Sequence, residues 1–308
     1  MPDATCRHAF VSYAPPADAH IIPIRRPIRS LCRLSGDQLA SGSDNGSIHL
    51  WDVRTGTITG SIDVGRIAVE PLCQVSDRLL VSGTGHEVIR TWDLETGTKT
   101  TSIGTDPYGI PRTMCLLPDG RLAVGITDDI GLWDLATEEC AAELRGHRGS
   151  VTALCLLRDG RLASGANDET IRLWDLVAGN EAACILNGGA SIDALVQLPD
   201  GRLAAASRDN VIRLWDLANA TQLQLVGHEA GIVALAVTSA GRLVSASRDS
   251  TIRLWDVSSG LELACIQLDA GVTCLVALPN NRLVAGDVDG RLHWFEIVDA
   301  MQKPTVLH

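Results

Sequence analysis

Short apolar runs alternate with polar turns along most of the chain. In one central stretch the runs 151–157, 161–166, 170–176 and 182–186 are separated only by a few polar or glycine residues. Runs of this length with many β-branched side chains are typical of strands, and no segment keeps the period of a helix. Asp-Gly pairs between runs, as in 118–121, favour tight hairpins because both residues tolerate a positive φ angle. The pattern predicts an all-β chain of antiparallel hairpins.

The four-strand pattern repeats about every 40 residues. A Trp marks the same point of every unit: Trp51, Trp92, Trp133, Trp174, Trp215, Trp255 and Trp294. Asp follows the first six of them, and Phe295 follows the last. One four-stranded sheet cannot bury both of its faces, whereas several sheets packed around an axis can. The repeat therefore predicts a ring of seven sheets.

Seven such units in register resemble the WD-repeat family, over about residues 19–298. The resemblance implies a seven-bladed β-propeller made of four-stranded antiparallel blades. We expect a tail or strap at 1–18, the propeller at 19–298 and a second tail at 299–308.

Ring closure has two candidate strands. Members of the family usually close the ring with the N-terminal strand, so the resemblance favours residues 19–24 as the fourth strand of the last blade. The β-branched residues Ile21 and Ile22 favour a strand there. Pro23 suits an outer edge strand, because proline has no amide N–H to donate to a neighbouring strand. The competing segment is 302–307, which matches the fourth-strand register of the preceding blade.

The net charge of the chain limits which classes of partner it is expected to bind. The formal net charge is −11 and the isoelectric point is about 5.1. An acidic surface repels phosphate groups, so we expect neither nucleic acid nor a membrane as partner. No run of 18 apolar residues occurs, and residues 1–18 lack the features of a signal peptide. We expect a cytoplasmic chain that is monomeric by itself and needs no cofactor.

The nine cysteines do not follow the spacing of disulfide or zinc motifs. Four of them, Cys32, Cys73, Cys115 and Cys155, occupy one position of the first strand in successive units. No Cys-x-x-Cys pair occurs. We interpret the cysteines as small core residues in a reducing compartment and predict no metal site.

Two units carry a polar set that the resemblance implies is structural. The sets are His147, Ser164, Asp168 and Trp174, and His228, Ser245, Asp249 and Trp255. In the family these side chains form a hydrogen-bonded chain inside a blade, where each polar group finds a partner. Ser, His and Asp also form catalytic triads, but a triad needs a reachable Ser oxygen and a pocket. Since the set recurs at fixed spacing and includes the repeat Trp, we predict no catalytic residue.

The resemblance implies that partners bind around the central channel. Two positions per unit face this surface: the start of the first strand, and the residue before the turn that joins the second and third strands. The predicted protein-binding face comprises Arg29, Asp44, Glu70, Tyr108, Arg112, Asp193, Arg208, Arg248 and Asp287. Arginines and carboxylates occupy different sectors, which favours a ligand oriented by charge. Tyr108 is the single candidate aromatic anchor.

We therefore expect a protein-binding scaffold or substrate-recognition module. One alternative is a hydrolase-like propeller enzyme that uses Asp44, Glu70 and Asp287 at the channel mouth. Another is the sensing part of a larger assembly, with residues 1–18 as a docking peptide.

Overall fold

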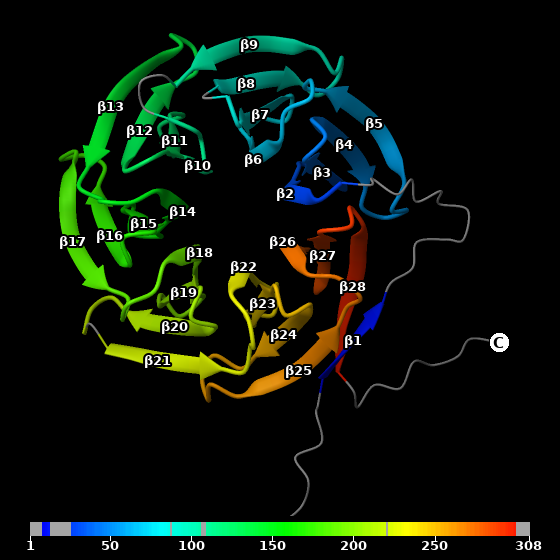
Figure 1. Ribbon diagram of the computed structural model, residues 1–308, viewed down its shortest axis with the longest axis vertical. Helices are drawn as coiled ribbons and strands as arrows, with labels where there is room; N and C mark the ends of the chain where they lie inside the picture. The colour runs from blue at the N-terminus through cyan, green and yellow to red at the C-terminus, as the bar shows by residue number, and fades with distance from the viewer. Residues whose placement is uncertain (1–7, 13–25, 87, 106–108, 220, 300–308) are drawn as a thin grey trace, which may run out of the picture.

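In a computed structural model, seven four-stranded antiparallel sheets stand around a central channel as the blades of a propeller (Figure 1). The structure describes residues 8–12, 26–86, 88–105, 109–219 and 221–299. All regular elements in these ranges are strands. They include no helix that is long and apolar enough to cross a membrane. The predicted all-β fold of seven blades is confirmed.

The four strands of a blade are called a to d, counted outward from the channel. The first blade contains β2 (Ile28–Arg33), β3 (Gln38–Ser43), β4 (Ser47–Asp52) and β5 (Ile58–Asp63). The second contains β6 (Val69–Gln74), β7 (Leu79–Thr84), β8 (Val88–Asp93) and β9 (Lys99–Gly104). The third contains β10 (Thr113–Leu116), β11 (Leu122–Gly125), β12 (Asp129–Asp134) and β13 (Glu139–Arg145).

The remaining blades follow the same order. The fourth contains β14 (Val151–Leu156), β15 (Leu162–Ala166), β16 (Thr170–Asp175) and β17 (Asn180–Leu186). The fifth contains β18 (Ile192–Gln197), β19 (Leu203–Ser207), β20 (Val211–Asp216) and β21 (Thr221–Val226). The sixth contains β22 (Ile232–Val237), β23 (Leu243–Ser247), β24 (Thr251–Trp255) and β25 (Glu262–Gln267). The seventh contains β26 (Val272–Leu278), β27 (Arg282–Asp287), β28 (Leu292–Asp299) and β1 (His8–Ser12).

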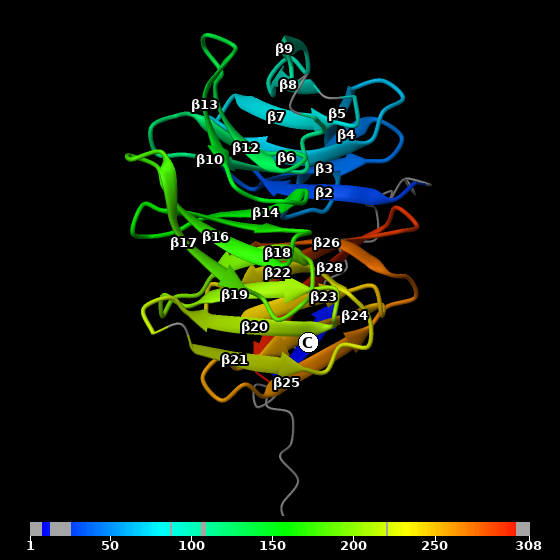
Figure 2. The same cartoon turned by 60° about the vertical axis from the view of Figure 1, so that its left-hand side comes forward.

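The a strands stand next to one another around the channel. β14 contacts β18, and β18 contacts β22, as the two views of the ring show (Figures 1 and 2). Close approach at the centre requires a small residue on strand b. At Gly165, for example, a Cβ would lie 2.5 Å from Cγ2 of Ile192 in the next blade.

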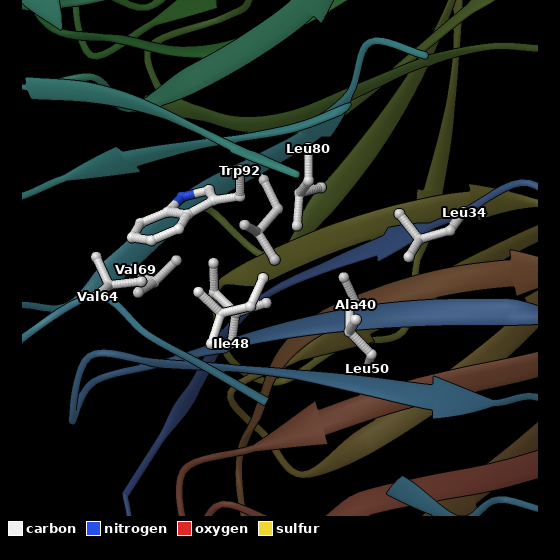
Figure 3. Close-up of a cluster of buried hydrophobic side chains, with 10 residues drawn as sticks. Leu34, Ala40, Ile48, Leu50, Val64, Val69, Leu80 and Trp92 are labelled. Atoms are coloured by element: carbon white, nitrogen blue, oxygen red, sulfur yellow. The ribbon is translucent and has the colours of Figure 1, made fainter. Parts of the chain in front are cut away.

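The core lies between blades rather than inside one. In the described residues, one apolar cluster fills each of the seven contacts between neighbouring blades. Figure 3 shows the cluster between the first two blades, where Ala40 and Ile48 of one blade face Leu80 and Trp92 of the other. Each blade therefore depends on both neighbours for burial of its faces.

Closure joins segments from the two ends of the chain. β1 pairs antiparallel with β28, His8 opposite Asp299 and Ser12 opposite Phe295, and completes the last blade (Figure 1). The N-terminal segment thus closes the ring, but the prediction that residues 19–24 form this strand is wrong. The closing strand lies inside the segment 1–18 that was expected to be a tail or strap.

The physical reason is the length of one connection. The register argument assumed a short d–a connection, such as 187–191 between β17 and β18. The chain between β1 and β2 instead runs over residues 13–27, so the closing strand lies further upstream. Residues 19–24 and 302–307 lie outside the described residues.

Candidate functional site

One face of the ring is hollowed around the channel. This face carries the b–c turns and the d–a connections. A cavity of about 730 Å³ opens there, within the range typical of ligand sites. Seven lining residues come from the start of strand a, one from each blade: Arg29, Glu70, Arg112, Thr152, Asp193, Val233 and Thr273. We call this cavity the channel mouth.

A β-bulge directs these side chains toward the channel. In six blades the pairing of strands a and b shifts register after the first residue of strand a, as between Ile28 and Ser30 or between Ile192 and Ala194. The extra residue is Arg29 in the first case and Asp193 in the second. Because a bulge leaves one residue unpaired and re-aims it, the repeated bulge explains why these positions converge at the channel mouth.

Two of the mouth arginines are held by carboxylates of their own blades. Arg29 donates two hydrogen bonds to Asp44, with Nε–Oδ1 at 2.9 Å and Nη2–Oδ2 at 3.2 Å. The Nε of Arg208 lies 3.1 Å from Oδ2 of Asp193. Each pair links the start of strand a to the b–c turn, which fixes the geometry of the mouth but neutralises the two guanidinium groups.

Two further arginines lack such a partner. Arg112 and Arg248 line the cavity and are exposed, and no carboxylate of the described residues forms an ion pair with either. They lie in the third and sixth blades. The mouth therefore carries uncompensated positive charge on a chain whose net charge is −11.

Glu70 lies in the arc between the first and third blades. Its carboxylate is open to water of the channel, but the channel walls surround it. Removal from bulk water raises the pKa of Glu70, while Arg29 and Arg112 act in the opposite direction. Glu70 thereby compensates part of the charge of Arg112, and Arg248 has no comparable neighbour.

Asp287 does not belong to this face, so its assignment to the predicted binding surface is wrong. Its side chain is fully buried. The carboxylate lies 2.8 Å from Nε2 of His293 and accepts backbone N–H bonds from Asp289 and Arg291. In the last blade Phe295, and not Trp294, pairs with the Leu of strand b that faces the repeat Trp in other blades. Counting back from Trp294 therefore reaches Asp287, the last residue of strand b, and Val288 lies at the mouth instead.

Other predicted face residues are placed as follows. Asp44 stands at the rim in its pair with Arg29, outside the cavity lining. Tyr108 lies outside the described residues. Gly271 and Val288 line the cavity but were not predicted, because neither carries the charge or aromatic ring by which surface residues were selected.

The carboxylates of the enzyme alternative are not brought together. Asp44 pairs with Arg29 and Asp287 is buried inside a blade, so only Glu70 lines the cavity. Within the described ranges, no group of three or more His, Cys, Asp or Glu side chains is arranged to hold a metal ion.

The two polar sets lie inside blades, away from the mouth. In the fourth blade, the indole N–H of Trp174 donates to Oγ of Ser164 at 2.8 Å, and that oxygen lies 2.7 Å from Nε2 of His147. Nδ1 of His147 lies 3.0 Å from Oδ2 of Asp168. The sixth blade repeats the chain through Trp255, Ser245, His228 and Asp249, at 2.8, 2.7 and 2.8 Å.

Both serines are completely buried, so substrate cannot reach their hydroxyl groups. Thr170 and Thr251 also join the chains, since each donates to the Asp two residues before it. The Asp-x-Thr spacing at the b–c turn was the signal in the sequence for these two residues. The sets connect strands b, c and the d–a connection within a blade, which is a structural task.

Sequence comparison agrees with this architecture. The family model described as "WD domain, G-beta repeat" matches residues 25–52, 138–175, 183–216 and 220–256. Each of the last three matches runs from strand d of one blade through strand c of the next. A search of curated proteins found no match.

Proposed function

Because this chain is a seven-bladed β-propeller of the WD-repeat family, we propose that it is a protein-binding scaffold or substrate-recognition module whose docking face is the channel mouth. Propellers of this family commonly serve as scaffolds for protein interactions and are typically not enzymes. The step from the family to this chain's own face rests on the site and not on the fold alone.

One observation carries the proposal: every blade contributes to a single cavity, and two of its arginines, Arg112 and Arg248, form no ion pair with a carboxylate of the described residues. Four arginines line the cavity against Glu70 and Asp193. Arginines that a partner can desolvate are frequent hot spots of protein interfaces. An acidic patch or segment of a partner would complement this surface and would be oriented by it.

The proposal includes a non-enzymatic role. The described cavity lining contains no His and no Cys, and its two hydroxyl-bearing strand residues donate to the backbone, Thr152 to Gly165 and Thr273 to Gly286. It also includes a monomer in a reducing cytoplasm that requires neither nucleic acid, membrane nor cofactor. The eight described cysteines are free thiols, which supports the reducing compartment.

The test is affinity capture from cells, read by quantitative mass spectrometry. The triple variant Arg112→Glu, Arg208→Glu and Arg248→Glu reverses charge at the mouth. A matched control, Arg78→Glu, Arg121→Glu and Arg161→Glu, makes the same charge change on the a–b turns of the opposite face. Melting curves establish that both variants fold.

We expect the wild type and the control to capture the same set of partners. The mouth variant should capture roughly tenfold less of these partners, or less still, because arginines at interfaces often contribute much of the binding energy. Equal capture by all three proteins would place the docking face elsewhere and reject the proposal.

A further inference from the structure

The arginines of the channel mouth are not equivalent. Arg29 and Arg208 are paired within their own blades, and Arg112 lies beside Glu70. Arg248, on the b–c turn of the sixth blade, has no ion-pair partner among the described residues. Its guanidinium group is therefore the mouth charge most available to a ligand.

Glycine and valine residues line the cavity together with Arg248. Gly271 lies against it: a Cβ built on Gly271 would be 3.5 Å from the carbonyl oxygen of Arg248 and 4.0 Å from Cγ1 of Val288. Val288 is 46% exposed, so its side chain is accessible to a ligand in the cavity. Val233, from the a strand of the same blade as Arg248, lines the same cavity. Arg248, two valines and a glycine that has no side chain thus line the same cavity.

We infer that this sector, formed by Arg248, Val233, Gly271 and Val288, binds a partner segment in which an acidic side chain lies next to an aliphatic one. The inference rests on the proposed function and names the chemistry of the ligand. A carboxylate matches one guanidinium group with two parallel hydrogen bonds. Burial of aliphatic groups on Val233 and Val288 adds hydrophobic stabilisation, and Gly271 leaves room for the approach of a peptide backbone.

A carboxylate fits this sector better than a phosphate. Phosphorylated segments are usually read by clusters of arginines. Here a single unpaired arginine stands next to two valines, so a doubly charged phosphate would lose water against an apolar wall with only one cation to compensate it. A basic segment would face repulsion from Arg248.

The experiment uses the full chain and a displayed library of random nonapeptides that are fused at both ends, so that no free terminus is offered. Selections are run on the wild type and on Arg248→Glu. Arg161→Glu is the matched control, because it makes the same charge change on the a–b turn of the opposite face. Gly271→Leu is a second variant that fills the gap by a different route, since a Cβ there meets only ordinary van der Waals contacts.

We expect the wild type to select Asp or Glu adjacent to Val, Ile or Leu. The selected peptides should bind Arg248→Glu and Gly271→Leu at least tenfold more weakly than the wild type, and their affinity for Arg161→Glu should change by less than threefold. Arg248→Glu should instead select Lys or Arg adjacent to an aliphatic residue, because the charge that chooses the ligand has been reversed.

Other outcomes overturn the inference and are distinguishable from failure of the proposed function. Peptides of another composition that are lost in the triple mouth variant would keep the docking face but reject the ligand assigned here. Peptides that bind all mouth variants equally would reject both. Absence of selection on the wild type, or tenfold tighter binding when phosphoserine replaces the acidic residue, would reject the carboxylate assignment.

Discussion

The fourth and fifth blades bury the same repeat Trp with different polar side chains. In the fourth blade, Trp174 donates to Ser164, which is joined to His147 and Asp168. The fifth blade has no His, and Ala205 stands where Ser164 does. Its indole donates to Oδ1 of Asn187 at 3.3 Å, and Nδ2 of Asn187 donates to Ser207 at 2.6 Å.

The change spreads to the charged residues of the blade. In the fourth blade the carboxylate of Asp168 contacts the imidazole of His147, and Arg172 forms an ion pair with Glu181 on strand d. In the fifth blade Asp209 has no His, and it pairs with Arg213 at 2.6 Å. The strand d residue opposite Trp215 is then Gln222 instead of a Glu. Different side chains thus provide the acceptor of the buried indole in the two blades, whereas Nε of Arg172 and Nε and Nη1 of Arg213 are buried without a hydrogen-bond partner.

The largest effect is expected where the two blades agree. Trp174→Ala and Trp215→Ala should each lower the free energy of unfolding by about 3–5 kcal/mol, because each removes a large side chain from the core between two blades. Urea unfolding of the two variants measures the loss. An unchanged unfolding midpoint in either variant would contradict the assignment of that Trp to the core.

The polar partners should matter less, and unequally. His147→Ala leaves the hydroxyl of Ser164 and the carboxylate of Asp168 without their imidazole partner, at a cost of about 1–3 kcal/mol. Asn187→Ala removes the acceptor of Trp215 and the donor to Ser207, two uncharged groups, so we expect about 1 kcal/mol. Urea unfolding of both variants and of the wild type measures the two losses in the free energy of unfolding. A larger loss for Asn187→Ala than for His147→Ala would contradict this ranking.

The two kinds of blade should also differ in their response to acid. Burial lowers the pKa of His147 and of His228, so the folded chain binds fewer protons than the unfolded chain as pH falls below the ordinary range of His. Their contribution to stability is complete above about pH 6.5 and is lost as the pH falls through their lowered values. The pKa of Asp249 is lowered to about 2, so its contribution is lost only in stronger acid.

The measurement is the unfolding midpoint between pH 7 and pH 5. The double variant His147→Asn and His228→Asn, which imitates the amide of the fifth blade, should show a weaker loss than wild type over this range. His49, whose pKa is also lowered by burial, leaves a residual slope in both proteins. Equal slopes would show that the two buried imidazoles do not titrate in this window.

The smallest effect concerns the outer ion pair. Glu181→Gln breaks the pair with Arg172 and should cost about 0.2–1 kcal/mol, less at high salt, because the pair is partly exposed. Gln222→Glu in the fifth blade should stabilise by a similar small amount, because Asp209 pairs only with Nη2 of Arg213 and leaves its buried Nε and Nη1 without a hydrogen-bond partner. Thermal melts at low and at high salt compare the two variants, and no gain from Gln222→Glu would mean that a carboxylate at this position does not reach Arg213.

Features that recur in every repeat were predictable from sequence, because the same pattern is seen several times along the chain. The seven Trp positions identify the blades, and the start of strand a locates all seven lining residues of that kind. Features that depart from the period were not predictable. Asn187 stands one residue before the repeat position that His147 and His228 occupy. Only the hydrogen bond from the indole of Trp215 to its side chain shows that it takes the place of the His-linked acceptor in the fifth blade.

The wrong predictions for Asp287 and for the closing strand also arose where the chain departs from the repeat period. Trp294 lies one residue before the repeat register, so the position counted from it fell on Asp287 instead of Val288. An unusually long connection placed the closing strand at residues 8–12. The pairs that neutralise Arg29 and Arg208 depend on side-chain geometry across a bulge, which spacing alone does not reveal.

The pairing of β1 with β28 has a consequence for the order in which the protein is made. Six blades consist of consecutive strands, so all four strands of each are present as soon as that part of the chain has been synthesised. β1 is synthesised before all of them, and its partner after all of them. At synthesis rates of about 5–20 residues per second, the delay is on the order of 15–60 s. Throughout that time the newborn chain carries a strand without its sheet, and the seventh blade forms only when translation has delivered the segment that receives it.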